Sequence, residues 1–145
     1  MKKIYIVIFV VLIIPVLVST VNAQTLQVDV DLDELKDIEE SKYKASGITT
    51  IRNIEGELIN ILQGSDHDAI VFNAGGYTHT SVAIRDCIEA ITVPVVEVHI
   101  SNIASRESFR HTSLLSPVAE GCIFGFGLQS YDLAVDYCMN YLNKR

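Results

Sequence analysis

The stretch Glu97–Asn102 carries the residue types best suited to chemistry in this chain. It follows the apolar residues Val95 and Val96 and is typical of a strand that ends in a polar loop, so strand alternation places Glu97 and His99 on the same face. Such a face is buried in an α/β sheet, where an unpaired carboxylate is costly. The two residues are therefore a candidate acid–base pair, in which the carboxylate orients the imidazole and raises its proton affinity. The alternative is a purely structural pair of polar residues at a strand end.

A second polar loop, Asn73–Ser81, follows the apolar strand Ala69–Phe72. Thr80 or Ser81 can cap the amphipathic helix that comes next. Open parallel sheets bind ligands at the carboxyl ends of their strands, so both loops should border one crevice. We expect four side chains to converge there, namely those of Asn73, His79, His99 and Ser101.

Strands alternate with helices along the body of the chain, which predicts an α/β fold with a parallel sheet covered on both faces. The expected strands are Ile48–Arg52, Ala69–Phe72, Val95–Ile100 and Cys122–Phe126, and the expected helices are Glu55–Gln63, Ser81–Ile91 and Ser130–Leu142. No internal repeat or interdomain linker interrupts this pattern, so we predict a single domain.

The first residues have the order of a secretory signal peptide. Lys2 and Lys3 precede the apolar run Ile4–Val18, which is short for a membrane span, and small residues up to Ala23 offer a cleavage site. We predict a signal peptide over residues 1–23, an exported protein (periplasmic or secreted) and one α/β domain over residues 24–145. The first strand would then come from Leu26–Leu32 or be absent. The competing interpretation is that the apolar run is a buried first strand of a cytoplasmic protein.

The composition narrows the choice of partner. The formal charge of −7 argues against nucleic acid or an anionic membrane as partner. An acidic small molecule is not excluded, because it needs only a local cationic pocket. Cys87, Cys122 and Cys138 form no close pair of metal ligands, so we expect buried free thiols and no metal site.

Taken together, the motifs resemble the type II 3-dehydroquinate dehydratases from about Asn53 to Tyr137. The matching segments are Asn53–Leu58, Asn73–Ser81 with Arg85-Asp86, Glu97–Asn102, Arg106–His111, Ser116–Ala119 and Gly125–Gly127. Several motifs in the right order are far more specific than any one of them. The resemblance implies a flavodoxin-like, doubly wound parallel sheet, in which the first strand is altered or uncertain here. It also implies elimination of water from 3-dehydroquinate through an enolate, without metal or organic cofactor.

The resemblance assigns roles to the residues of the two loops. His99 corresponds to the proton donor that assists departure of the hydroxyl, and Glu97 would hold it. Asn73 corresponds to a residue that hydrogen-bonds the substrate, and an amide that donates and accepts suits a polyol. Ser101 and the backbone N–H of Ile100 correspond to the clamp on the substrate carboxylate.

Three further residues are implicated in the same way. Arg110 corresponds to a substrate-hydroxyl contact, and His79 lines the same pocket. Asp86 corresponds to a residue that reaches the pocket of a neighbouring subunit. The family assembles as trimers, commonly four to a dodecamer, so the resemblance implies a homo-oligomer.

The chain departs from the family at the general base. In the family this base is a Tyr on a lid after the first strand, helped by an Arg, and the corresponding positions here fall near Asn22 and Leu17. Tyr43 is the nearest downstream phenol, but no family motif surrounds it. The identity of the base is therefore unknown, and a non-catalytic binding or assembly subunit is the alternative function. An altered gene start is a third explanation for the departure.

Overall fold

The computed structural model describes residues 3–8, 46–142 and 144, with side-chain burial from residue 52 onward. Its strands are β1 (Lys3–Ile8), β2 (Ser46–Ile51), β3 (Ala69–Asn73), β4 (Val95–His99) and β5 (Gly121–Phe124). Its α-helices are α2 (Glu55–Gln63), α3 (Val82–Ala90) and α4 (Gln129–Leu142), and short 3₁₀ helices span η1 (Gly75–His79), η2 (Ile103–Ser105) and η3 (Ser108–Arg110). The elements predicted between residues 48 and 142 are thus all present, with ends that differ by at most two residues.

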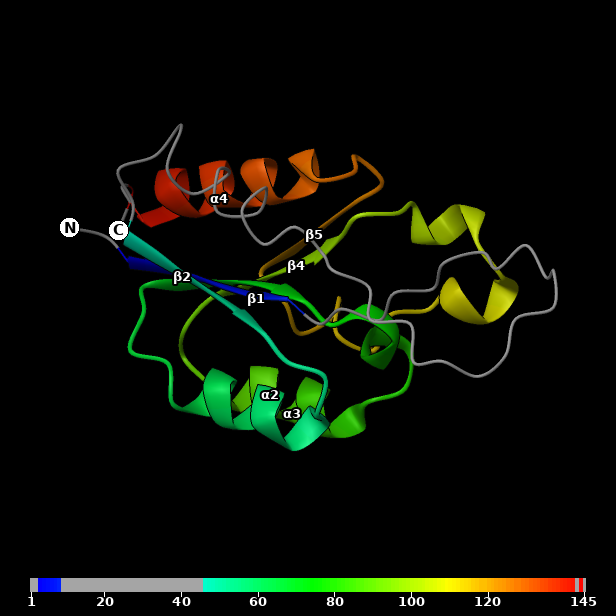
Figure 1. Ribbon diagram of the computed structural model, residues 1–145, viewed down its shortest axis with the longest axis horizontal. Coiled ribbons are helices and arrows are strands. Elements are labelled where there is room, and N and C mark those ends of the chain that lie inside the picture. The colour runs from blue at the N-terminus through cyan, green and yellow to red at the C-terminus, as the bar shows by residue number, and fades with distance from the viewer. Residues whose placement is uncertain (1–2, 9–45, 143, 145) are drawn as a thin grey trace, which may run out of the picture.

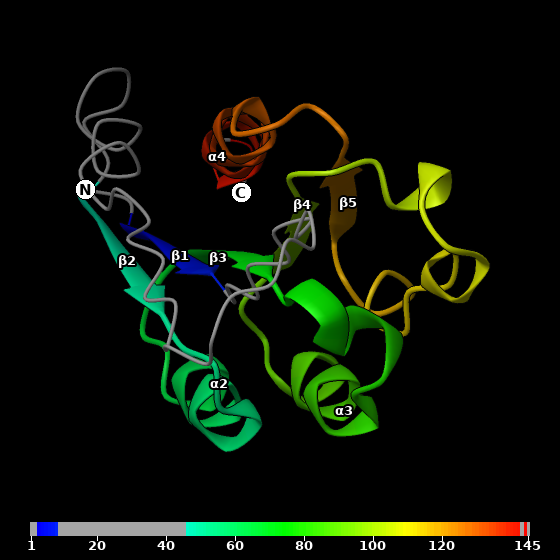
Figure 2. The ribbon, with the colours of Figure 1, turned by 45° about the vertical axis from the view of Figure 1, so that its right-hand side comes forward.

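The strands form one parallel sheet in the order β2-β1-β3-β4-β5. This is the strand order of the flavodoxin-like fold, in which the order reverses beside the first strand. Helices α2 and α3 cover one face of the sheet and α4 covers the other (Figures 1 and 2). The predicted fold class, a doubly wound parallel α/β sheet, is confirmed.

Residues at the start of the chain form an inner strand of this sheet. Lys3–Ile8 pairs with β2 on one side and with β3 on the other. This is the alternative that competed with a signal peptide over residues 1–23. Leu26–Leu32, the strand expected if the leader is cleaved, lies outside the described residues. Cleavage after Ala23 would remove β1. Export stays a prediction, and it conflicts with the presence of β1 in the mature protein if the leader is cleaved.

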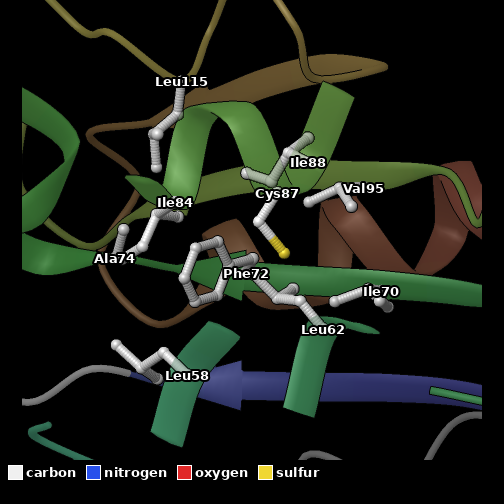
Figure 3. Close-up of a cluster of buried hydrophobic side chains, with 10 residues drawn as sticks. All are labelled: Leu58, Leu62, Ile70, Phe72, Ala74, Ile84, Cys87, Ile88, Val95 and Leu115. Atoms are coloured by element: carbon white, nitrogen blue, oxygen red, sulfur yellow. The ribbon is translucent and has the colours of Figure 1, made fainter. Parts of the chain in front are cut away.

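Side chains of β3 alternate between two hydrophobic clusters, one on each face of the sheet. Ala69 and Val71 pack toward α4, whereas Ile70 and Phe72 pack toward α2 and α3. Figure 3 shows the second cluster, in which Phe72 lies between the sheet and both helices. Because a fully covered strand is apolar on both faces, β3 is a continuous apolar run in the sequence. These clusters hold the carboxyl ends of β3 and β4 in place.

The loop between β3 and α3 is fixed by its own polar groups. The Ser81 hydroxyl accepts a hydrogen bond from the backbone N–H of Ile84 at 2.9 Å, so Ser81 rather than Thr80 is the N-cap of α3. Gly75 has φ of +54°, a conformation that glycine adopts without strain. The chain can therefore turn sharply from β3 into η1.

The cysteines follow the prediction in large part. All three are free, with Cys87 and Cys138 buried and Cys122 partly exposed. Burial raises the pKa of the Cys138 thiol to about 12 and that of Cys122 to about 11.

Within the part of the chain that the structure describes, no helix has the length and apolar character needed to cross a membrane.

Candidate active site

Polar side chains gather where β3 and β4 end. Asn73 is the last residue of β3 and His99 the last residue of β4, and these strands are neighbours in the parallel sheet. Their carboxyl ends therefore lie at the same edge, where open α/β sheets bind ligands. Both side chains are buried, at 6% and 4% exposure.

Glu97 and His99 are in direct contact beneath this edge. The Nε2–H of His99 donates to Oε1 of Glu97 at 2.8 Å, and Glu97 is 1% exposed. Both follow Val95 at alternate positions, on the face of the sheet that α2 and α3 cover. The pairing proposed from their spacing is thus present. It leaves Nδ1 as the ring nitrogen that can exchange a proton with a ligand.

Three hydroxyl groups surround the Glu97 carboxylate. Thr78 and Ser116 each donate to it, and the Ser113 hydroxyl lies 3.0 Å from Oε1 and 3.1 Å from Oε2. We call these three residues the hydroxyl cradle. Burial by itself would raise the pKa of Glu97, but hydrogen bonds from His99, Ser116 and Thr78 outweigh it and lower the pKa to about 2. Glu97 is therefore an anion throughout the neutral range.

The depressed pKa of Glu97 predicts a specific acid sensitivity. A carboxyl whose pKa falls from 4.5 to about 2 on folding stabilises the protein above about pH 5 and loses that contribution as the pH drops toward 2. Urea unfolding between pH 6 and pH 3 should show a steeper loss of stability in the wild type than in Glu97→Gln. Glu89→Gln, at an exposed position on α3, should keep the wild-type slope. Equal slopes in wild type and Glu97→Gln would contradict the assignment.

Asn73 is held at both ends of its side-chain amide. Its Nδ2 donates to the phenol oxygen of Tyr131 at 2.7 Å, and its Oδ1 accepts from the backbone N–H of Gly75 at 3.0 Å. Tyr131 is 1% exposed, and burial raises its pKa to about 12. It is therefore a support for Asn73 rather than a base. One amide hydrogen and one lone pair of Asn73 remain for a ligand.

The other predicted binding residues lie in the loops that follow these strands. His79, in η1, donates through Nδ1 to the carbonyl of Thr112 at 2.8 Å. Arg110, in η3, donates through Nε to Glu107 at 2.9 Å, and its guanidinium lies over the ring of Phe109. Ile100 and Ser101 come directly after β4 and are exposed.

Asp86 stands apart from these residues. Its side chain is 63% exposed on α3, and its carboxylate accepts a hydrogen bond from Arg85 at 2.9 Å. Arg85 also contacts Glu89 one turn further along the helix. The structure therefore places Asp86 on the outer surface of α3, where a carboxylate could reach another molecule.

Comparison of the chain with known proteins identifies its family. The model of the family described as dehydroquinase class II matches residues 23–139. This chain belongs to the class II dehydroquinase family. The family suggested by the loop motifs is confirmed, and the match includes every candidate residue from Asn73 to Arg110.

Individual relatives and a solved structure support the same family assignment. A protein named 3-dehydroquinate dehydratase from Trichodesmium erythraeum is 48% identical over 80% of this chain and 81% of the relative. One of the same name from Fusobacterium nucleatum is 48% identical over 76% of this chain and 78% of the relative. The crystal structure of type II dehydroquinase from Butyrivibrio crossotus has a TM-score of 0.76 and 30% identity, over 94% of this chain and 97% of that chain.

Some residues that contact the candidate site were not predicted from the sequence. They are the members of the hydroxyl cradle and Tyr131, which supports Asn73. Serine and threonine are common in loops, and none of these residues lies near its partner in the sequence. The available signal was that Thr78 and Ser116 lie within the matched segments Asn73–Ser81 and Ser116–Ala119.

The structure does not describe the segment that the resemblance associates with the general base. The segment that would carry the lid falls within residues 9–45, outside the described residues. Tyr77 is described, and its hydroxyl donates to the carbonyl of Asn53 at 3.5 Å. Among the described residues no group of His, Cys, Asp and Glu could hold a metal ion.

Proposed function

We propose that this chain eliminates water from 3-dehydroquinate to give 3-dehydroshikimate, with His99 as the proton donor. The observation that carries the proposal is the buried His99–Glu97 pair at the carboxyl end of β4. It occurs in a chain of the class II dehydroquinase family whose relatives, at 48% identity, are named 3-dehydroquinate dehydratase.

The proposed reaction needs one base and one acid. A base removes a proton from the carbon beside the ketone, and the electron pair forms an enolate. The enolate then expels the hydroxyl group, which takes a proton from His99 and leaves as water. Imidazole suits this step because it changes protonation near neutral pH. The base is unassigned.

The binding groups match the functional groups of such a substrate. Asn73 offers a donor and an acceptor to hydroxyl groups, and Arg110 offers a cation in a chain of net negative charge. We assign the substrate carboxylate to Ser101 and the backbone N–H of Ile100, with His79 lining the pocket. The exposure of Ile100 and Ser101 supports this assignment.

We further propose that the protein assembles as trimers, up to a dodecamer, with Asp86 reaching a neighbouring subunit. The exposure of the Asp86 side chain supports this, because it leaves the carboxylate accessible to another molecule. Export remains a proposal that rests on residues 1–23 alone.

Two measurements on the full chain test the proposed function. Adding 3-dehydroquinate should produce the ultraviolet absorbance of a conjugated enone. Calorimetry with a dehydroquinate-like ligand should show binding that weakens roughly 10- to 100-fold in Arg110→Ala, the usual effect of losing a charged hydrogen bond. Lys144→Ala is a matched control, because it removes a cation far from the candidate site. Lys144 follows the end of α4, where Tyr141 lies near Val95 at the start of β4, whereas the site is at the carboxyl end of that strand.

The outcomes distinguish the two candidate functions. Absorbance together with binding supports the enzyme. Binding without absorbance supports the binding subunit, which the departure at the lid motif favours. Absence of both would contradict each function.

A further inference from the structure

The Glu97 carboxylate is saturated with hydrogen-bond donors. A carboxylate has about four acceptor positions. His99 donates to one oxygen, and the three hydroxyls of the cradle provide the remaining contacts. A protonated Glu97 would have to donate a hydrogen, yet each of these neighbours already presents one. The geometry therefore favours the anion independently of any titration.

Ser113 acts as a hydrogen-bond donor within the cradle. Its oxygen accepts backbone N–H groups from Leu115 at 3.1 Å and from Ser116 at 2.9 Å. Both of its lone pairs are thus in use, so Ser113 can act here only as a donor, and the acceptors within reach of its single hydrogen are the Glu97 carboxylate at 3.0 Å and the Thr78 hydroxyl at 2.8 Å, which itself donates to Glu97. Ser113 thus closes a tight turn and supplies a hydrogen to the network around the buried anion, either directly or through Thr78.

We propose that the hydroxyl cradle sets the acid strength of His99 through Glu97. This inference rests on the proposed function for its catalytic meaning. Each hydroxyl stabilises part of the Glu97 charge, so less of that charge stabilises the imidazolium. His99 is held in place by the anion but keeps its ability to release a proton. The three hydroxyls act as positioning residues, because they reach the substrate only through Glu97 and His99.

The cradle also ties two loops together. The Leu114 N–H donates to the carbonyl of Thr78 at 2.8 Å, next to the contact between His79 and Thr112. These hydrogen bonds connect the segment that follows Arg110 to η1, and both segments also contact Glu97 through the cradle. The buried Glu97 anion thus positions His99, the proposed acid, and also the segment that follows Arg110, the proposed cationic binding residue.

Few titratable groups among the described residues lie near the Glu97 carboxylate. Among the described residues, those that face Glu97 are His99 on β4 and Cys122 on β5. Burial, with the nearby Glu97 charge, raises the pKa of Cys122 to about 11, so this thiol is neutral over the working range. η1 and the segment after η3 present hydroxyls to Glu97. A change in the titration of His99 can therefore be traced to Glu97 and the cradle.

Thr78 offers the sharpest test. Thr78→Val removes the hydroxyl and keeps the shape, whereas Thr78→Ser keeps the hydroxyl. Thr80→Val is the matched control, because Thr80 follows the same 3₁₀ helix but is exposed and bonds the carbonyl of Gly76. The titration of the His99 ring is followed by NMR in the full chain, and the pH profile of kcat is measured alongside.

In Thr78→Val the titration midpoint of His99 should rise by about 0.5–1 pH unit, less than the roughly 1–2 units that one hydrogen bond to a charged group is worth, because the hydroxyl acts on His99 only through Glu97. kcat should fall roughly 3- to 10-fold, because a more basic imidazole is a weaker acid. The alkaline limb of the kcat profile should move up with the midpoint. Thr78→Ser and Thr80→Val should titrate like the wild type. Glu97→Gln should shift the midpoint down, because it removes the anion.

An unchanged or lowered midpoint in Thr78→Val would overturn the proposal, since a merely structural hydroxyl would alter stability alone. If Thr78→Val does not fold, Ser116→Ala gives the same test at a partly exposed position. The NMR titration needs no turnover. A wild type without enone formation, but with a midpoint that shifts in Thr78→Val, would reject the proposed function and retain the cradle.

Discussion

His99→Ala is expected to lower kcat by about 10²–10⁴, the usual effect of removing a positioned acid or base. The hydroxyl group would then have to leave without a proton from the protein. The side chain is 4% exposed and is fixed by Glu97 at 2.8 Å, so solvent can replace its geometry only poorly. Turnover is measured by enone absorbance, and ligand binding should persist better than turnover.

The control for His99→Ala is another histidine of the same chain. His67 lies just before β3, at the amino end of the sheet, and contacts Ser65. His67→Gln should therefore keep kcat within a few-fold of the wild type. Unaltered turnover in His99→Ala would show that this pocket is not the active site. A loss of similar size in His67→Gln would show that the effect comes from stability.

Deleting residues 1–23 is expected to abolish the native fold. β1 pairs along its length with both β2 and β3, so its removal separates β2 from the sheet and exposes backbone groups along β3. The cluster that α2 forms with Ile70 and Phe72 would lose its support on that side. Circular dichroism and urea unfolding should show loss of a cooperative transition, compared with the full chain.

This deletion also decides between strand and signal peptide. Cooperative unfolding of residues 24–145 would mean that another segment, such as Leu26–Leu32, can replace β1. Cleavage after Ala23 would then be compatible with a folded protein. The intact mass of the native protein provides the independent check, because cleavage removes Lys3–Ile8 from the measured chain.

Local pattern in the sequence was sufficient for most elements of the body. Helix α2 was predicted with its observed ends, and β3 and β4 were recognised as apolar runs that end in polar residues. Strand alternation also placed Glu97 and His99 on one face. These inferences succeeded because a covered strand must be apolar and because its side chains alternate with a period of two.

The start of the chain was ambiguous for a physical reason. An apolar run after two lysines favours a signal peptide, but it is also compatible with an inner strand of a parallel sheet. Pairing with β2 and β3 is what marks Lys3–Ile8 as a strand, and that pairing depends on residues about 40 and 65 positions away.

What the sequence determined by itself was the family, the α/β class and the pairing of Glu97 with His99. The tertiary structure decided what surrounds that pair. Tyr131 meets Asn73 across 58 positions of sequence, and Ser116 meets Glu97 across 19. Hydroxyl and phenol groups carry no periodic signal, so their partners are set by how the loops fold over the strand ends. Burial then makes these contacts consequential, because a carboxylate hidden from water must find its donors within the protein.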